Sequence, residues 1–182
     1  MGKNQQYILT YGTQVLFETV ENGKQGIGVY ENGEYIFIEE SLSRFLARNE
    51  MHFVTNLAVA KRIAKDILGS THGTPYIFME MIWIPLEIYN RNVTIYVALH
   101  HIERISSVSK SKTLLQLAGS ITIILNMSKA RLFSRLLVAC MIKLIVDLKK
   151  QSIYKKRNMN NKPAEITREH GEVYYTRKKF LE

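Results

Sequence analysis

The sequence predicts an α+β fold built mostly from an antiparallel sheet with hairpins. The first forty residues are rich in β-forming residues and turn dipeptides, two stretches with helical periodicity follow, and a long apolar stretch comes later. We expect two short-to-medium helices, at about 41–47 and 53–68, and one long apolar helix at about 134–151. With 182 residues, 46% of them hydrophobic and 23% charged, the chain can bury a core of ordinary size.

The composition changes near residue 152, so we expect a single α+β domain at 1–152 and a polar, partly mobile tail at 153–182. The tail is rich in lysine and contains Pro163 and Gly171, which is typical of a chain end. We expect no signal peptide, because residues 1–6 are polar and the first apolar stretch is broken at Gly12.

Four short strands are expected before residue 40, at 7–11, 14–20, 26–30 and 35–38. The dipeptides Asn22-Gly23 and Asn32-Gly33 between them favour tight hairpins. We interpret the nearby glycines as hairpin glycines rather than as a phosphate-binding loop. No helix follows them, and no Lys-Ser/Thr pair closes such a motif.

The next two segments are expected to be helices, the first capped by Ser41 and the second ended by Gly69. In the second, the apolar residues recur at helical spacing and the cations lie on the other side. The apolar residues are Leu57, Ala60, Ala64, Ile67 and Leu68, and the cations are Lys61, Arg62 and Lys65.

The middle of the chain predicts further strands. Pro75 opens a strand at 76–84 that Pro85 ends, and a second long strand covers 93–105. A loop rich in serine and lysine is expected at 106–113. Strand 121–125 should then pair with 130–133 around a turn at 126–129.

Ser134 is the expected N-cap of the long helix. Its polar residues form one narrow strip, and all other residues from 136 to 148 are apolar, so we expect burial on most sides, in the core or in a subunit interface. The segment is too short and too charged to span a membrane. Cys140 is expected to be a small buried residue. The strip consists of Arg135, Ala139, Lys143, Asp147 and Lys150.

Motifs for catalysis, metal binding or cofactor binding are absent from the sequence, so we expect no enzyme and no cofactor. His100 and His101 lie on an expected strand, where neighbours point to opposite faces, so this pair alone should not chelate a metal. A single cysteine excludes an intrachain disulfide and fits a reducing cytoplasm.

The positive charge is concentrated in one part of the chain. Residues 1–40 have 2 Lys/Arg and 6 Asp/Glu, residues 41–157 have 18 and 6, and residues 158–182 have 5 and 4, which together give the net charge of +9. A surplus of +12 in the middle segment favours binding to nucleic acid or an anionic membrane. Besides the loop lysines Lys110 and Lys112, the expected contacts are Lys61, Arg62, Lys65, Arg91, Lys129, Arg131 and Arg135.

The ordered spacing of several residues resembles the ComK competence transcription factors of Gram-positive bacteria, from about residue 7 to 151. Several features of the family recur here: an aromatic residue followed by a basic pair, a Pro near the end of a hydrophobic strand, and an Arg six residues after that Pro. So do a hairpin like 121–133, a following serine and a long helix; the family's usual Trp is Tyr96. The resemblance is carried by Arg48, His52-Phe53, Lys61-Arg62, Pro75, Pro85, Arg91, Tyr96 and His101.

The resemblance implies a cytoplasmic, nucleoid-associated activator of DNA-uptake genes that recognises A/T-rich boxes of double-stranded DNA, mainly through the minor groove. It further implies a homodimer or higher assembly on DNA, adaptor-guided proteolysis involving the C-terminal tail, and no membrane partner. Arg91 is then the expected groove-inserting residue, because a loop Arg can enter a narrow A/T minor groove. The other named cations would clamp phosphates.

Three alternatives remain open at this point. The chain could be a diverged ComK-like protein with weak DNA binding, or a protein-interaction module that uses the apolar helix 135–150. A peripheral membrane protein is the third, because anionic lipid also attracts basic surfaces.

Overall fold

The structure, a computed structural model, describes residues 7–53, 57–69, 71, 73–78, 80–88, 93–160, 166–169 and 172–175. It divides into two compact units, residues 1–146 and 147–182, which we describe separately. The expected division into a domain at 1–152 and a tail at 153–182 stays a prediction.

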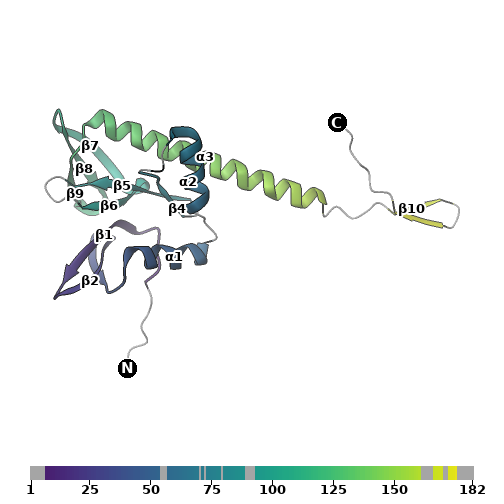
Figure 1. Cartoon of the computed structure of the whole chain (residues 1–182), viewed down its shortest axis with the longest axis horizontal. Coiled ribbons are helices and arrows are strands. Elements are labelled where there is room, and N and C mark those ends of the chain that lie inside the picture. The colour runs from purple at the N-terminus through teal and green to yellow at the C-terminus, as the bar shows by residue number, and fades with distance from the viewer. Residues whose placement is uncertain are drawn as a thin grey trace, which may run out of the picture. The chain divides into compact units, whose positions relative to one another are not determined.

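The larger unit is built on a six-stranded, entirely antiparallel sheet in the order β3-β2-β1-β6-β5-β4 (Figure 1). The predicted hairpin dipeptides Asn22-Gly23 and Asn32-Gly33 join its first three strands, with all four residues at positive φ. The strands are β1 (Thr13–Glu21), β2 (Lys24–Glu31), β3 (Glu34–Ile38), β4 (Tyr76–Phe78), β5 (Met81–Glu87) and β6 (Thr94–Ala98).

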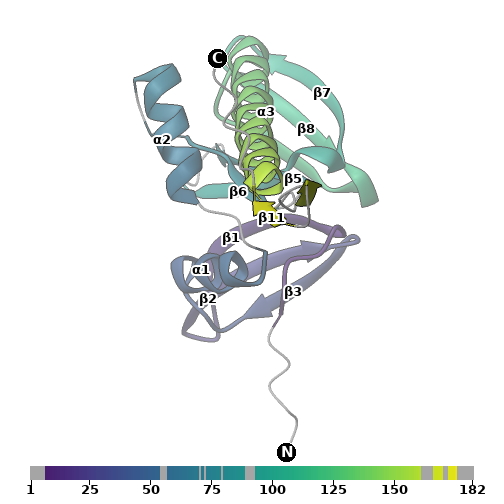
Figure 2. The same cartoon turned by 90° about the vertical axis from the view of Figure 1, so that its right-hand side faces the viewer.

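A second antiparallel sheet, in the order β7-β8-β9, and three helices complete the α+β fold that the sequence predicts (Figure 2). The sheet consists of β7 (Ile102–Ser109), β8 (Lys112–Leu117) and β9 (Thr122–Leu125), and the helices are α1 (Leu42–Phe53), α2 (Leu57–Leu68) and α3 (Lys129–Asn160). The smaller unit contains the end of α3 and a hairpin of β10 (Ile166–Glu169) and β11 (Glu172–Tyr175).

Alternate residues of the six-stranded sheet enter two different cores. Trp83 and Leu16 are fully buried in the core that α1 covers, on one face. Their neighbours Val15 and Ile84 are buried on the other face, in a core shared with the second sheet and the first turns of α3. Because both faces are covered, β5 is apolar at nearly every position rather than at alternate ones.

Two elements near the start differ from the predictions. Residues 7–10 form no strand; instead, Thr13 accepts a hydrogen bond from the Thr10 amide at 3.1 Å and folds this segment into a turn. The first helix begins as predicted after Ser41, whose hydroxyl lies 3.4 Å from the Arg44 amide. It continues to Phe53 rather than 47, so α2 begins at Leu57 rather than 53.

The predicted strand at 76–84 is two strands, since β4 and β5 pair as a hairpin in which Phe78 faces Met81. Pro85 does not end β5 but lies inside it, paired with Tyr96 of β6. It is tolerated because β4 is too short to reach it. The position therefore lies on an open sheet edge, where a missing N–H leaves no ladder bond unmade.

The predicted strand at 93–105 is interrupted by a 3-10 turn, Leu99–His101, through which the chain passes from one sheet to the other. The turn also brings His100 and His101 together instead of to opposite faces. Their rings lie 4.3 Å apart, and both Nε2 atoms contact the Tyr11 carbonyl oxygen, at 2.9 and 2.7 Å. The predicted loop at 106–113 is largely strand, with its turn at Lys110 and Ser111.

The segment 121–133 is not a hairpin. Strand β9 pairs with β8, and residues 130–133 belong to α3, which begins at Lys129. Ser128 rather than Ser134 caps this helix, because its hydroxyl accepts the Arg131 amide at 3.3 Å. The helix is also longer than predicted at its C-terminal end, where it reaches Asn160.

The first turns of α3 are buried within this fold on one side only, rather than on most sides. The polar strip faces inward, and Ala139 and Lys143 are buried. Lys143 reaches Glu80 at 2.9 Å, and Arg135 donates to the Pro85 carbonyl at 3.2 Å, so both cations find oxygen partners. The opposite, apolar side is exposed, and Cys140 is exposed with it rather than buried.

Gly26 of β2 should be intolerant of any side chain. A Cβ there would collide with the Ile38 carbonyl oxygen and lie 2.5 Å from the Phe37 ring. Gly26→Ala should therefore destabilise the fold by about 1–3 kcal/mol, as overpacking does. Gln25→Ala at the exposed neighbouring position should stay within about 0.5 kcal/mol. Urea unfolding followed by Trp83 fluorescence measures both, and equal effects would contradict the prediction.

Candidate nucleic-acid interface

Helix α2 has one buried face and one cationic face. Ala60, Ile63 and Ala64 are buried and pack against Ile77 of β4 and Ile142 of α3. The helix lies beside α3, as both views of the fold show (Figures 1 and 2). Gly69 ends α2 as predicted: its φ is +67° and its amide donates to the Lys65 carbonyl at 2.9 Å.

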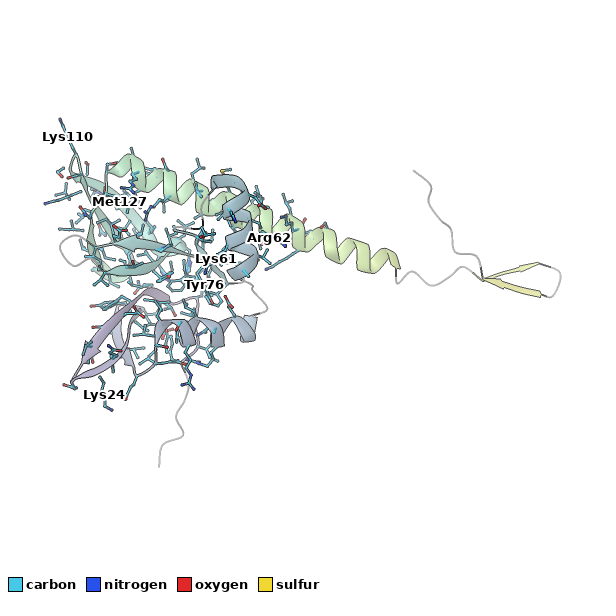
Figure 3. The ribbon with its side chains drawn as sticks, viewed as in Figure 1. Lys24, Lys61, Arg62, Tyr76, Lys110 and Met127 are labelled. Carbon is cyan, nitrogen blue, oxygen red and sulfur yellow. The ribbon has the colours of Figure 1, made fainter. Side chains whose placement is uncertain are left out.

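Lys61, Arg62 and Lys65 lie on the exposed side of α2, as the sequence predicts. Within the described part of the chain, none of the three forms an ion pair with a carboxylate. Figure 3 labels Lys61 and Arg62 on this helix, well separated from Lys24 on β2. We call these three residues the α2 cationic face.

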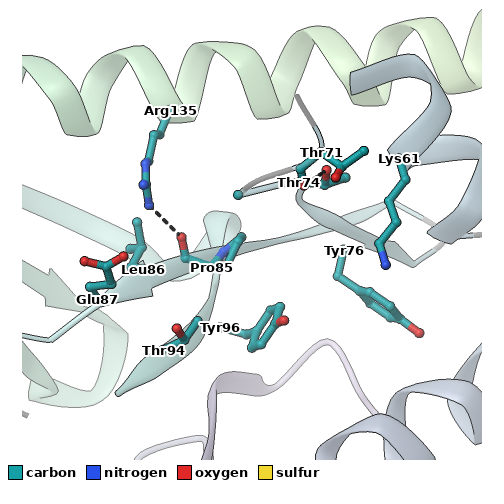
Figure 4. Close-up of a pocket in the computed structure, with 11 residues that line it drawn as sticks. Lys61, Thr71, Thr74, Tyr76, Pro85, Leu86, Glu87, Thr94, Tyr96 and Arg135 are labelled. Atoms are coloured by element: carbon teal, nitrogen blue, oxygen red, sulfur yellow. Dashed lines mark hydrogen bonds between the residues drawn. The ribbon is translucent and has the colours of Figure 1, made fainter. Parts of the chain in front are cut away.

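The α2 cationic face borders a hollow of about 270 Å³. Lys61 of α2 and Arg135 of α3 both line it, so the fold brings together two of the predicted DNA-contacting residues that are 74 positions apart (Figure 4). Besides these two cations, residues of the loop before β4 and of β4, β5 and β6 line the hollow, among them Thr74, Tyr76, Pro85 and Tyr96.

The hollow lies beyond the end of β4. That strand pairs with β5 only as far as Tyr76 and Trp83, so among the described residues the outer edge of β5 has no paired strand at Pro85 and Leu86. The end of β9 adjoins β5 again at Glu87, whose carbonyl accepts the Asn126 amide at 3.2 Å, and at Ile88, which is bridged to Leu125. The Pro85 carbonyl, which no strand partner reaches, instead accepts a hydrogen bond from the Arg135 guanidinium (Figure 4). Thr74 holds the adjoining loop, because its hydroxyl donates to the Thr71 carbonyl at 2.7 Å.

Tyr76 and Tyr96 contribute neutral aromatic surface to the hollow. Burial raises the pKa of both phenols, and the nearby carboxylates of Glu50 and Glu18, respectively, raise them further. The Tyr76 hydroxyl donates to the Leu46 carbonyl at 2.8 Å. Both phenols stay protonated at neutral pH, so the charged groups that line the hollow are the cations Lys61 and Arg135 and the carboxylate of Glu87.

Lys129 and Arg131 are exposed in the first turn of α3. They were expected on a hairpin, but a helix N-terminus strengthens their positive potential, because its free amides carry the positive end of the helix dipole. No acidic residue occupies this first turn. The Lys129 ammonium lies 5.7 Å from the centre of the Phe133 ring.

Arg91 lies outside the described residues. It belongs to segment 89–92, which joins β5 to β6; the hairpin is closed by the Ile88 amide, which donates to the Val93 carbonyl at 3.2 Å. Glu87 and Thr94, the paired residues of β5 and β6 nearest to that segment, both line the hollow.

Two other cations of the basic segment form contacts within the fold. Arg48 is enclosed by Glu40 and the Tyr7 carbonyl, at 2.6 and 2.8 Å, and Lys143 is held by Glu80. Sequence reasoning could not identify Thr74 and Tyr76 as lining residues of the hollow, because only the folded arrangement at the start of β4 brings them beside Lys61.

Other kinds of site receive little support from the described residues. No three metal-ligating side chains gather there. None of the helices in that part of the chain combines the length and the apolar composition that crossing a bilayer requires.

A family model described as "ComK protein" matches residues 4–151, which is most of the chain and includes all seven predicted DNA-contacting residues. No curated protein and no solved structure matches.

Proposed function

Since the chain belongs to the ComK family of competence transcription factors, we propose that it binds A/T-rich double-stranded DNA and activates DNA-uptake genes. The observation that carries the proposal is the α2 cationic face. Its three exposed cations form no ion pair with a carboxylate of the described residues, and they lie beside a hollow lined by Lys61 and Arg135. Phosphate contacts of this kind supply most of the affinity of a DNA-binding protein.

We assign the groove contact to Arg91 and the phosphate contacts to the other cations. Lys61, Arg62 and Lys65 project from one rigid helix, and Lys129 and Arg131 stand at the N-terminus of another. Two rigid cationic elements would fix the orientation of a duplex. A loop arginine could then read a narrow minor groove.

The remaining parts of the proposal follow from the family. A homodimer or higher assembly would read paired boxes, and an adaptor protein would deliver the chain to an ATP-dependent protease through its C-terminal tail. We propose a cytoplasmic, nucleoid-associated protein that needs no cofactor. ComK proteins are transcription factors rather than enzymes, so no catalytic residue is assigned.

A duplex with two A/T-rich boxes tests the proposal against a G/C-rich duplex of equal length. Arg91→Ala should weaken binding to the A/T duplex more than to the G/C duplex, because only the first offers a narrow groove. Lys61→Ala should weaken both similarly, because phosphates are common to both. Fluorescence anisotropy at several salt concentrations measures these affinities.

Equal losses for Arg91→Ala on the two duplexes would refute its groove role. A wild-type protein whose DNA affinity does not depend on salt, or is not reduced by a minor-groove drug, would refute the proposed function as a whole.

A further inference from the structure

The outer side of α3 is an exposed apolar surface on a rigid helix. Leu137 and Leu144 have 64% and 59% of their surface exposed, and Phe133 and Met141 are also exposed. Cys140 lies among them. We call these five residues the α3 stripe; farther along the same helix, Leu148 is exposed as well. A continuous apolar surface of this kind is unusual on a monomer and marks an interaction site.

The spacing of these residues is that of a helix-pairing seam. Leu137 and Met141 are four residues apart, and Met141 and Leu144 are three apart. This is the alternation of three and four residues that lets two helices pack along their length. The inward side of α3 is already occupied, since Ala139, Ile142 and Val146 are buried in the fold. The stripe is therefore free for a second helix.

Four residues of the stripe are symmetrical about the point between Cys140 and Met141. Leu137 and Leu144 lie equally far from that point on either side. A two-fold axis through this point, perpendicular to α3, exchanges Leu137 with Leu144 and Cys140 with Met141. In an antiparallel pair about that axis, each of these apolar residues faces an apolar residue of the second copy, which is the self-complementarity that a symmetric dimer interface requires.

We propose that the α3 stripe binds the same stripe of a second copy of this chain, with the two helices antiparallel. Leu137 of each copy then packs against the partner's Leu144, and the two Cys140 side chains lie close to the axis. None of the stripe residues is charged, so two chains of net charge +9 bring no like charges together across this contact. The assignment names the surface of the homodimer in the proposed function, but it rests on the stripe and is tested without DNA.

Sedimentation of the full-length protein over a concentration series, without DNA and at 0.3 M salt, measures the pairing. Leu144→Glu should raise the dimer dissociation constant by about 100-fold or more, because each dimer loses the contact twice. Val108→Glu changes an equally exposed apolar residue on β7 and should have no effect. Circular dichroism verifies that both variants are folded, as expected for changes at exposed positions.

A charge-pair variant tests the antiparallel geometry. In Leu137→Lys/Leu144→Glu each introduced ammonium faces the partner's introduced carboxylate, so the double variant should dimerise at least tenfold more tightly than Leu144→Glu alone. Parallel pairing would place like charges together and give no recovery, which would overturn the proposed geometry.

The only cysteine in the chain gives an independent measurement. A short bismaleimide should join the two Cys140 thiols of the wild-type dimer. The variant Cys140→Ser/Lys24→Cys, which carries its thiol on β2, should remain uncrosslinked. A wild-type protein that stays monomeric at about 100 μM, or that dimerises without crosslinking or without a response to Leu144→Glu, would overturn the inference and leave the DNA-binding proposal untouched.

Discussion

Replacing Lys61, Arg62 and Lys65 together with glutamine should reduce the salt dependence of DNA binding by about 2.7 in the slope of log K against log salt. Each phosphate contact on a duplex contributes about 0.9 to that slope, because it releases condensed counterions. The affinity advantage of the wild type should therefore be largest at low salt. The ratio of wild-type to variant affinity should fall by about 40-fold between 50 and 200 mM salt.

A matched triple variant controls for net charge. Lys24→Gln/Arg44→Gln/Arg104→Gln removes the same three charges from exposed positions outside α2. It should change the slope little, since only residues that contact phosphates release counterions. Titration of one A/T-rich duplex at four salt concentrations measures both slopes. If the two triple variants gave the same slope, the α2 cationic face would have no special role.

Arg48→Ala should destabilise the protein by about 3–5 kcal/mol, although Arg48 belongs to the same basic segment. Its guanidinium lies 2.6 Å from a Glu40 oxygen and donates to the Tyr7 carbonyl, and only 12% of the side chain is exposed. Removing Arg48 leaves the enclosed Glu40 carboxylate without this partner. The free energy of unfolding then falls by more than the contact itself contributes, because a buried charge is left uncompensated. The midpoint of thermal unfolding should fall by roughly 10 °C or more.

Arg44→Ala is the matched control, because Arg44 pairs with the same carboxylate at 3.7 Å from a side chain that is 84% exposed. It should cost no more than about 0.5 kcal/mol. Arg48→Met combined with Glu40→Gln should recover part of the loss, since it removes both charges and retains the volume. Similar melting temperatures for Arg48→Ala and Arg44→Ala would show that the enclosed pair does not stabilise the fold.

Local signals in the sequence predict the fold class well. Asn22-Gly23 and Asn32-Gly33 form hairpins because their positive φ angles are a property of those residues. The cations of α2 face solvent because helical periodicity fixes which residues share a side. The family resemblance, based on spacing over most of the chain, is confirmed by the match at residues 4–151.

The wrong predictions concern features that depend on distant residues. Pro85 is a strand breaker by local rules, but the short β4 leaves an open edge at which a proline fits. Lys143 faces inward, where its ammonium reaches Glu80, which is 63 residues away. Periodicity shows that α3 has a polar strip and an apolar side, but only these partners determine which side faces the core.

Gln14 couples the unfolding of the two sheets. Its side chain, 1% exposed, accepts the Gly33 amide at 2.8 Å and donates to the Ala118 carbonyl at 2.5 Å. One amide thus ties the β2–β3 turn to the end of β8, more than eighty residues later. The Gly33 N–H, although in an exposed turn, should exchange with solvent deuterium as slowly as the core of the second sheet. Separating the sheets would leave two polar groups of Gln14 unpaired, so they should open as one cooperative unit.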